Sequence, residues 1–422
     1  MIAAVQPRKS LLIKLFLVVL SGAGMIAAIT SWRHQDAKPN SQSGLSSPQF
    51  NKSPVIVGFR WLGDEIAYPP PRPGEDESAI GPIDPFFSEV GYQIHGDTFP
   101  MTWADDGEIY ASAGDPGWGG KNDGLDVEKF SGMPPHYTIT RVNRMPDYMG
   151  SGGGGPKPSG MISVDGVIYL AFQNLLGTKP PAHGPQDSGS RVEGEISQHG
   201  SDATIVSSRD HGKTWTPDIE DIKVPMFPGN TFGGPAFVNT GRNNADAPDQ
   251  YVYAVSTDQW DNGSALRVGR VPADRIQDRS AWEWIAGLED YNHPVWSGNL
   301  QNAIPVLNDD GRMSLPDMVY VGSIRRYLLL TWRLYKNFSP RDGTELMIYD
   351  APHPWGPFTL VHQEAFWESV DMTPYCPRLP LKWLQTKEHE LVGWIQFSGN
   401  WRKNSRHYRS HVREFKMQIA AP

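Results

Sequence analysis

Three aspartates at the ends of β-rich runs are well placed for acid-base chemistry. Asp97 lies in the run IHGDTF, Asp115 in AGDPGWGG and Asp258 in STDQW. Two carboxyl groups can cleave a glycosidic bond when one is held protonated as the acid and the other is ionised as nucleophile or base. We predict catalytic roles for these three, with Asp97 as the ionised group, although an Asp beside Gly also commonly bonds its own turn. The acid is left open among Asp258, Asp317 and Glu193.

A second cluster predicts a different reaction. His136, Tyr137 and Arg141 lie close together in the sequence, followed by Arg144. A Tyr/His pair can remove the C5 proton of a uronate while an arginine neutralises its carboxylate, as in a polysaccharide lyase. The third alternative is a non-catalytic glycan-binding protein, favoured if the mouth carboxyl groups lie more than about 10 Å apart. No pair of histidines has metal-ligand spacing, so we expect neither a metal nor a cofactor.

The elements that must position these residues are predicted from five similar stretches, each with two short β-rich runs around a turn. They cover residues 102–112, 161–172, 235–255, 318–332 and 379–397. Their spacing of roughly 60 to 75 residues suits one four-stranded blade per repeat. We predict an all-β fold, a five-bladed β-propeller. In a six-bladed alternative, residues 203–215 head their own blade instead of forming the outer hairpin of blade two.

The residues just before the first strand and just after the second strand of each repeat should share one face, the mouth of the propeller. From these positions, and from tryptophans set among Gly, Asp and Asn, we predict the substrate-binding residues His95, Lys157, Trp118, Trp260, Asp317, Arg333, Arg378 and Trp401. The same rule selects Gln173, Asn174, Asn230, Thr231, Trp332, Tyr375 and Ser398. Trp118, Trp260, Trp296 and Trp401 are expected to be exposed platforms, and Trp215, Trp282, Trp284 and Trp383 to be core.

Residues 208–215, with the sequence SRDHGKTW, predict a hairpin locked by its own side chains. Ser208 and Asp210 can bond the turn backbone, Gly212 can adopt a positive φ, and Trp215 can cover the sheet. This pattern resembles the Asp-box of sialidase-like β-propellers, which marks a fold and not an active site. True sialidases use three arginines and a Tyr/Glu pair on six blades, and this chain differs from that pattern.

Further runs extend the resemblance: residues 95–99, 102–107, 327–332, 355–358 and 377–383. They resemble an uncharacterised family of secreted five-bladed β-propellers that is similar to furanosidase-like glycoside hydrolases. The resemblance covers most of the chain beyond Gly58. It implies an exported protein that acts on polysaccharides or oligosaccharides, and some distant relatives cleave arabinan.

The two ends of the chain carry separate signals. Arg8, Lys9 and Lys14 precede a hydrophobic run over residues 15–29, which predicts a signal peptide or an N-terminal anchor within residues 1–37. Residues 38–53 are expected to be a flexible linker, and residues 54–422 the propeller. We expect a secreted or periplasmic protein, membrane-anchored if the segment is not cleaved. Residues 55–62 should pair beside residues 413–419, which removes a sheet edge.

Composition limits the other classes. The chain has 422 residues, 43 of them Gly and 37 Pro, which suits many tight turns in one large domain. Its net charge of −9 argues against a nucleic-acid partner. The single cysteine, Cys376, can form no internal disulfide. We expect a monomer whose partner is a saccharide.

Overall fold

The structure is a computed structural model, and it divides into two units, residues 1–46 and 47–422. It describes residues 50–68, 96–116, 125–145, 156–176, 200–218, 221–335, 343–365, 367, 372–399 and 407–421, all in the second unit. The predicted signal segment therefore lies outside the described residues. Within the described part of the chain, no helix is both long enough and apolar enough to cross a membrane.

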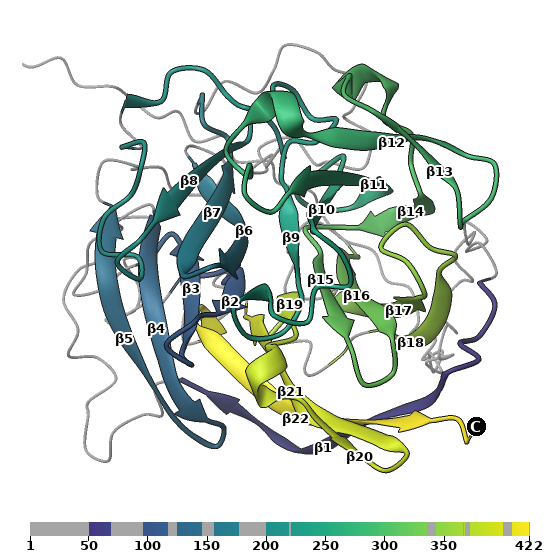
Figure 1. Cartoon of the computed structure of the whole chain (residues 1–422). Coiled ribbons are helices and arrows are strands. Elements are labelled where there is room, and N and C mark those ends of the chain that lie inside the picture. Colours follow the sequence, from purple (N-terminus) through teal and green to yellow (C-terminus); the bar gives the residue numbers. More distant parts are fainter. Residues whose placement is uncertain are drawn as a thin grey trace, which may run out of the picture. The chain divides into compact units, whose positions relative to one another are not determined.

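The described residues form four β-sheets, which we divide into five groups of mainly antiparallel strands, numbered 1 to 5 (Figure 1). Group 1 holds β2 (Met101–Trp103), β3 (Ile109–Gly114), β4 (Leu125–Met133) and β5 (His136–Met145). Group 2 holds β6 (Lys157–Val164), β7 (Val167–Gln173) and β8 (Thr204–Ser208). Group 3 holds β9 (Ala236–Asn239), β10 (Tyr251–Thr257), β11 (Gly263–Pro272), β12 (Glu283–Leu288), β13 (Pro294–Ser297) and β14 (Leu307–Met313).

Group 4 holds β15 (Asp317–Val321), β16 (Arg326–Leu334), β17 (Thr344–Ala351) and β18 (Thr359–Ala365). Group 5 holds β19 (Tyr375–Arg378), β20 (Gln385–Lys387), β21 (Glu390–Ser398), β22 (Ser410–Ile419) and β1 (Ile56–Ala67). A parallel pairing of β9 with β15 joins groups 3 and 4 into one sheet. Four short 3-10 helices complete the described elements: η3 (Arg242–Asn244), η4 (Arg279–Ala281), η5 (Leu300–Asn302) and η6 (Leu381–Trp383).

The groups are arranged around one axis, which makes the fold a β-propeller. In Figure 1 the first strands β2, β6, β9, β15 and β19 surround the centre, and the later strands lie further out. Each group packs on the next through an apolar cluster that draws residues from both, and one such cluster joins Phe130 of group 1 to Trp383 and Val412 of group 5. Buried on both faces, a strand such as β16 is a nearly continuous apolar run, RYLLLTWRL.

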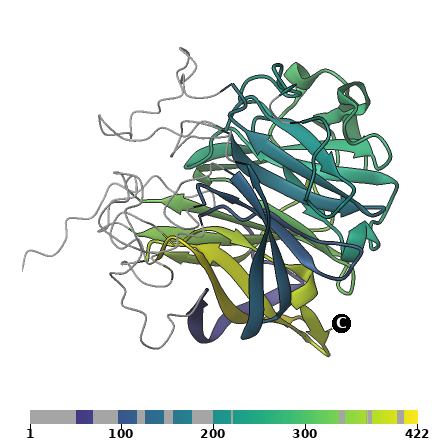
Figure 2. The same cartoon turned by 90° about the vertical axis from the view of Figure 1, so that its left-hand side faces the viewer.

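The predicted pairing of the two ends is confirmed. β1 runs antiparallel to β22, with Phe59 opposite Met417 and Trp61 opposite Phe415. Both views show β1 in purple alongside the yellow C-terminal strands (Figures 1 and 2). Phe50 already packs edge-on against Tyr349, at 5.2 Å between ring centroids, so contacts with the propeller begin within the segment expected to be a linker.

The predicted strand pairs of the first four repeats are confirmed, and residues 204–208 pair with β7 as the outer part of group 2. The fifth repeat was predicted wrongly in its first strand. Residues 375–378, not 379–384, form the inner strand β19, and the chain then enters the 3-10 helix η6. The N–H of Leu379 is used by the side chain of Asp317, and Pro380 has no N–H to donate, so the strand does not continue past Arg378.

The self-bonded hairpin is also confirmed. Gly212 N donates to Ser208 Oγ at 2.7 Å, and Thr214 N and Oγ1 donate to Asp210 at 2.9 and 2.7 Å. Gly212 has φ 87°, and Trp215 packs against the apolar cluster between groups 1 and 2. Ser207 and Thr216 bridge across it, at the outer edge of group 2.

Candidate active site

Asp97 lies on the approach to the inner strand of group 1, next to the end of β3. Its backbone exchanges two hydrogen bonds with Gly114, at 2.9 and 3.0 Å. A Cβ at Gly114 would lie 2.7 Å from Asp97 Oδ1, so the glycine provides the space for this carboxyl group. The next residues, Thr98 and Phe99, have φ 64° and 38°. Such strained conformations in residues other than glycine are concentrated at functional sites.

Asp115 follows Gly114 directly and lies beside Lys157, the first residue of β6. Lys157 Nζ contacts Asp115 Oδ1 at 2.7 Å, and the two side chains are only 1% and 5% exposed. A buried ammonium at this distance favours the ionised form of its carboxyl partner. Asp115 also has a positive φ of 52°.

Two tyrosines from group 5 cover the pair. Tyr375 OH donates to Asp97 Oδ2 at 2.8 Å, and Tyr408 OH lies 3.5 Å from Asp115 Oδ2. Both rings are buried, and burial together with the nearby carboxylates raises their pKa values well above the usual range. They therefore act as neutral hydrogen-bond donors. We call Asp97, Asp115, Lys157, Tyr375 and Tyr408 the carboxyl site.

The two carboxyl groups have different surroundings. Burial, followed by the charge of Asp115, raises the pKa of Asp97 to about 7, while the Tyr375 hydrogen bond and the Lys157 charge oppose this shift. Asp97 Oδ1 accepts no hydrogen bond from the described residues. This environment favours a protonated Asp97 and an ionised Asp115, the reverse of the predicted assignment for Asp97.

Arg378 and Asp317, predicted to bind substrate, instead hold backbone. Arg378 Nε donates to Thr98 O and its Nη1 to Pro316 O, both at 2.8 Å, so this buried side chain fixes the segment that carries Asp97. Leu379 N donates to Asp317 Oδ2 at 2.8 Å. Asp317 lines a separate hollow with Thr102, Asn239 and Leu381, among others, whose lining includes neither Asp97 nor Asp115.

Trp260 is not an exposed platform. It is 1% exposed and packs against Trp332 and Tyr375, with ring centroids 5.2 and 5.9 Å away. The prediction of exposure is wrong because the polar neighbours of Trp260 lie in a turn while its ring enters the core. Trp282, Trp284 and Trp383 are buried, as predicted, and Trp296 is partly buried under the guanidinium of Arg270.

Asp258 serves a turn. Its Oδ1 accepts hydrogen bonds from Ser264 N at 2.9 Å and Ala265 N at 3.2 Å, which orders the chain entering β11. Asp258 therefore bonds the backbone of its own turn, as an Asp close to a glycine commonly does, and the glycine here is Gly263.

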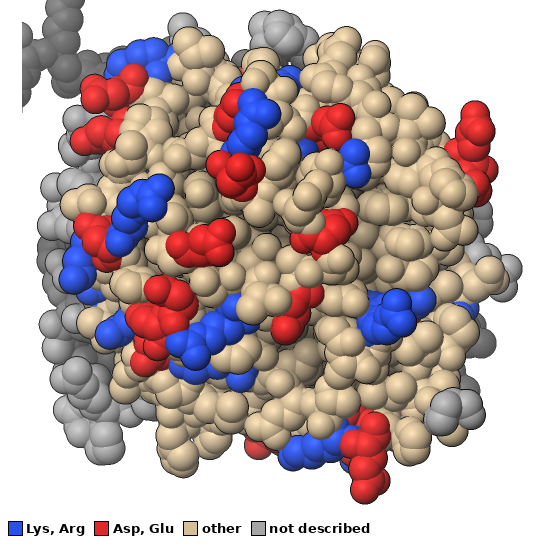
Figure 3. All heavy atoms as spheres, viewed as in Figure 1, with Lys and Arg blue, Asp and Glu red and all other residues tan. Residues whose placement is uncertain are grey.

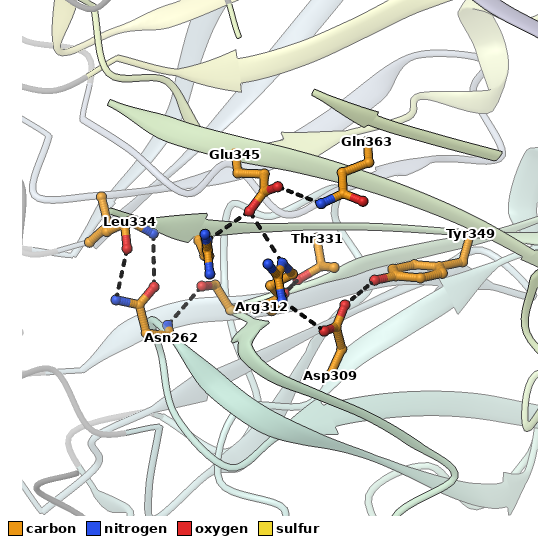
Figure 4. A network of polar contacts seen from close by, with 10 residues as sticks. Asn262, Asp309, Arg312, Thr331, Leu334, Glu345, Tyr349 and Gln363 are labelled. Carbon is orange, nitrogen blue, oxygen red and sulfur yellow. Dashed lines mark hydrogen bonds and ion pairs between the residues drawn. The ribbon is translucent and has the colours of Figure 1, made fainter. Parts of the chain in front are cut away.

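Arg333 belongs to a buried charge network in group 4 and the end of group 3. Its Nε lies 2.7 Å from Glu345 Oε2, opposite it in the β16–β17 pair. Figure 4 shows Glu345 also bonded to Arg312 and Gln363, and Arg312 to Asp309. The main contacts of Arg333 are therefore internal.

The lyase cluster is not brought together. Along β5, His136 is exposed and the next residue, Tyr137, is buried against Phe130 and Trp383, because successive side chains point to opposite faces of a strand. Arg141 Nε lies 3.5 Å from Asp126, in group 1. His95, Trp118, Trp401 and Glu193 lie outside the described residues, as does the side chain of Arg144.

Sequence reasoning missed two features. Tyr408 precedes β22, a later strand than the two whose ends were used to predict residues at the mouth. Asp105, Asp106 and His211 are mostly exposed and place ligand atoms within 4.8 Å of one another, the kind of group that could hold a metal ion. They come from distant segments, and Asp105 and His211 already bond each other at 2.8 Å.

Comparison with known proteins gives structural similarities only. No family model matches the sequence, and no curated protein matches it. The α-L-arabinofuranosidase PaAbf62A from Podospora anserina is 12% identical, with 81% of this chain and 96% of that chain covered and a TM-score of 0.43. The α-L-arabinanase of Cellvibrio cellulosa is 11% identical, covering 78% and 96%, with a TM-score of 0.44. An endo-arabinase from Bacteroides thetaiotaomicron is 9% identical, covering 78% and 96%, with a TM-score of 0.41.

Proposed function

We propose that this protein is a glycoside hydrolase that acts on polysaccharides or oligosaccharides through Asp97 and Asp115. The observation that carries the proposal is a buried pair of interacting carboxyl groups in unlike environments, next to the end of β3 and the start of β6. Pairs whose surroundings favour opposite protonation states are the usual acid and base of glycosidic cleavage. Among the described residues, His136 and Tyr137 lie on opposite faces of β5, which does not support the lyase alternative.

The proposed roles follow from the partners. Asp97 is the general acid, which donates its proton to the leaving glycosidic oxygen. Asp115, kept ionised by Lys157, attacks the anomeric carbon or takes a proton from the attacking water. Tyr375 and Tyr408 orient the two carboxyl groups by donating hydrogen bonds.

The finer features of the fold belong to the same proposal. We take the five strand groups as five blades and the hairpin at residues 208–215 as an Asp-box of the sialidase-like type. The side-chain bonds of Ser208 and Asp210 support the second assignment. Among the predicted substrate-binding residues, His95, Trp118 and Trp401 stay proposals.

Export is part of the proposal as well. The charged and hydrophobic N-terminal segment supports a signal peptide or anchor within residues 1–37. Mass analysis of the protein from a membrane and a soluble fraction will show whether the segment is cleaved.

The test is a screen of the purified protein against arabinan, xylan, alginate, laminarin and mycobacterial arabinogalactan, with product masses measured. Hydrolysis adds water and gives saturated products, whereas elimination gives unsaturated ones. Binding without cleavage would favour the non-catalytic glycan-binding alternative.

The matched variants are Asp97→Asn, Asp115→Asn and, as a control, Asp258→Asn. We expect the first two to lose roughly 10³-fold or more in kcat, about 4 kcal/mol. Asp258→Asn keeps an oxygen that accepts the hydrogen bond from Ser264 N, so its kcat should stay within a few-fold of the parent value. Full activity in Asp97→Asn and Asp115→Asn would contradict the assignment.

A further inference from the structure

Gln173, the last residue of β7, has a buried side chain whose polar atoms have no hydrogen-bond partner among the described residues. It is 0% exposed, and neither Oε1 nor Nε2 forms a hydrogen bond with the described residues. Most buried polar groups in proteins are bonded, because leaving one unpaired lowers stability. An amide kept in this state calls for a partner other than the side chains and backbone that the structure describes.

Gln173 is a direct neighbour of the carboxyl site. In the β6–β7 pair it lies opposite Lys157, whose ammonium bonds Asp115. Side chains directly opposite each other in an antiparallel pair leave the same face of the sheet, with Cβ atoms about 5 Å apart. A group bound between the two carboxyls is therefore within reach of the Gln173 amide.

Two glycines lie close against this amide. A Cβ at Gly200 would lie 3.1 Å from Gln173 Oε1, and a Cβ at Gly234 would lie 3.0 Å from it. Neither position has a φ that requires glycine. A side chain at either position would press on Oε1, so the two glycines allow the Gln173 amide to keep its position.

We propose that Gln173 is a substrate-binding residue that bonds hydroxyl groups of the sugar held at the carboxyl site. The inference rests on the proposed glycoside hydrolase function. A primary amide carries two N–H donors and a carbonyl acceptor, and a sugar hydroxyl both donates and accepts. Neighbouring hydroxyls on one ring match this pattern, so Gln173 selects sugars that keep them unsubstituted.

The first variant is Gln173→Met, which keeps the length of the side chain and removes its polar atoms. We expect kcat/KM on the cleaved polysaccharide to fall about tenfold to a hundredfold, because two neutral hydrogen bonds are lost. The melting temperature should stay unchanged or rise, since an unpaired buried amide is removed. A structural role for Gln173 predicts the opposite result, a lower melting temperature with unchanged kcat/KM, and would overturn the proposal.

A matched control and a second variant make the result decisive. Gln363→Met removes an amide whose Nε2 bonds Glu345 at 2.6 Å, so it should lower the melting temperature and leave kcat/KM unchanged. Gly234→Ala keeps Gln173 but places a Cβ 3.0 Å from its Oε1, which displaces the amide, so kcat/KM should fall in this variant as well. If Gln173→Met lowers both kcat/KM and the melting temperature, the Gly234→Ala variant decides between the two roles. An unchanged kcat/KM in Gly234→Ala overturns the proposal.

Failure of the inference can be told from failure of the proposed function. If the parent cleaves a polysaccharide of the panel and Gln173→Met does so equally well, only the inference fails. If none is cleaved but one raises the melting temperature of the parent, the hydrolase proposal fails. The Gln173 contact is then judged by whether Gln173→Met loses that stabilisation. If no polysaccharide is cleaved or bound, both fail.

Discussion

At the scale of single residues, Lys157 distinguishes the two carboxyl groups of the site. Its ammonium bonds Asp115, whereas the bonded oxygen of Asp97 accepts from the neutral phenol of Tyr375. Both contacts are buried, so little water screens them. The same pair of aspartates can therefore serve two chemical roles.

Replacing Lys157 tests this asymmetry. Lys157→Met leaves the Asp115 carboxylate buried without its ammonium, which commonly costs about 3–5 kcal/mol of stability. It also removes a charge that lowers the pKa of Asp97. We expect a lower melting temperature and a loss of kcat of at least a hundredfold, measured by calorimetry and by reducing-sugar release. Unchanged kcat would contradict the role given to Asp115.

The raised pKa of Asp97 makes stability depend on pH. In the unfolded chain the pKa of Asp97 is 3.8, whereas in the folded state its pKa is about 7, so the folded carboxyl keeps its proton to a higher pH. Between these values the folded state binds more protons, so the free energy of unfolding decreases as pH rises through this window. Denaturant titrations from pH 4 to pH 8 should show this slope, and Asp97→Asn should flatten it. An equal slope in both proteins would refute the assignment.

The same pKa of Asp97 should also determine how kcat/KM depends on pH. An acid must be protonated, so kcat/KM should fall as pH rises through about 7. Tyr375→Phe removes a hydrogen bond that lowers the pKa of Asp97, and should move this fall to higher pH. A shift to lower pH would show that Tyr375 does not stabilise the ionised form.

Part of the site could be predicted from the sequence. Asp97, Asp115, Lys157, Gln173 and Tyr375 were all selected by their positions at strand ends, because such ends share one face of a propeller. The rule selected Asp258 and Trp260 equally, since it cannot tell a turn-bonding carboxylate or an inward ring from an available one. The protonation states depend on burial and on contacts between distant segments, which no local pattern contains.

At the scale of elements, turn chemistry made the inner hairpins predictable. The Asp105–Asp106–Gly107 and Asp165–Gly166 turns each join two strands close in sequence, and Gly107 and Gly166 have φ 85° and 76°. The first strand of the fifth repeat was predicted wrongly because the apolar residues of LPLKWL, residues 379–384, suggest a strand. Pro380 and the buried Trp383 instead favour a 3-10 helix.

Strand β1 protects the edge of β22. A chain that begins after Ala67 would lack β1 and expose the hydrogen-bonding edge of β22, along with Phe415 and Met417. We expect this chain to aggregate, as measured by light scattering.

A chain that begins at Ser47 is the control, because it keeps β1 and the contact of Phe50 with Tyr349. It should remain monodisperse and melt in one cooperative transition. A monodisperse chain without β1 would show that closure does not depend on this strand.

At the scale of the whole propeller, the carboxyl site exists only when the ring is closed. Asp97 comes from group 1, Lys157 from group 2 and Tyr375 from group 5, and the bond from Tyr375 to Asp97 joins residues 278 positions apart. On the face shown in Figure 3, the described Lys and Arg side chains are interspersed with Asp and Glu.

The pairing of β1 with β22 has a consequence for biosynthesis. Within the propeller β1 leaves the ribosome first and β22 last, and the contact between Glu65 and His411 spans 346 positions. Until the final strand is translated, β1 has no partner and Tyr408 is absent from the site. A nascent chain therefore stays inactive and open at its seam until translation is nearly complete, which leaves it compatible with crossing a membrane before it folds.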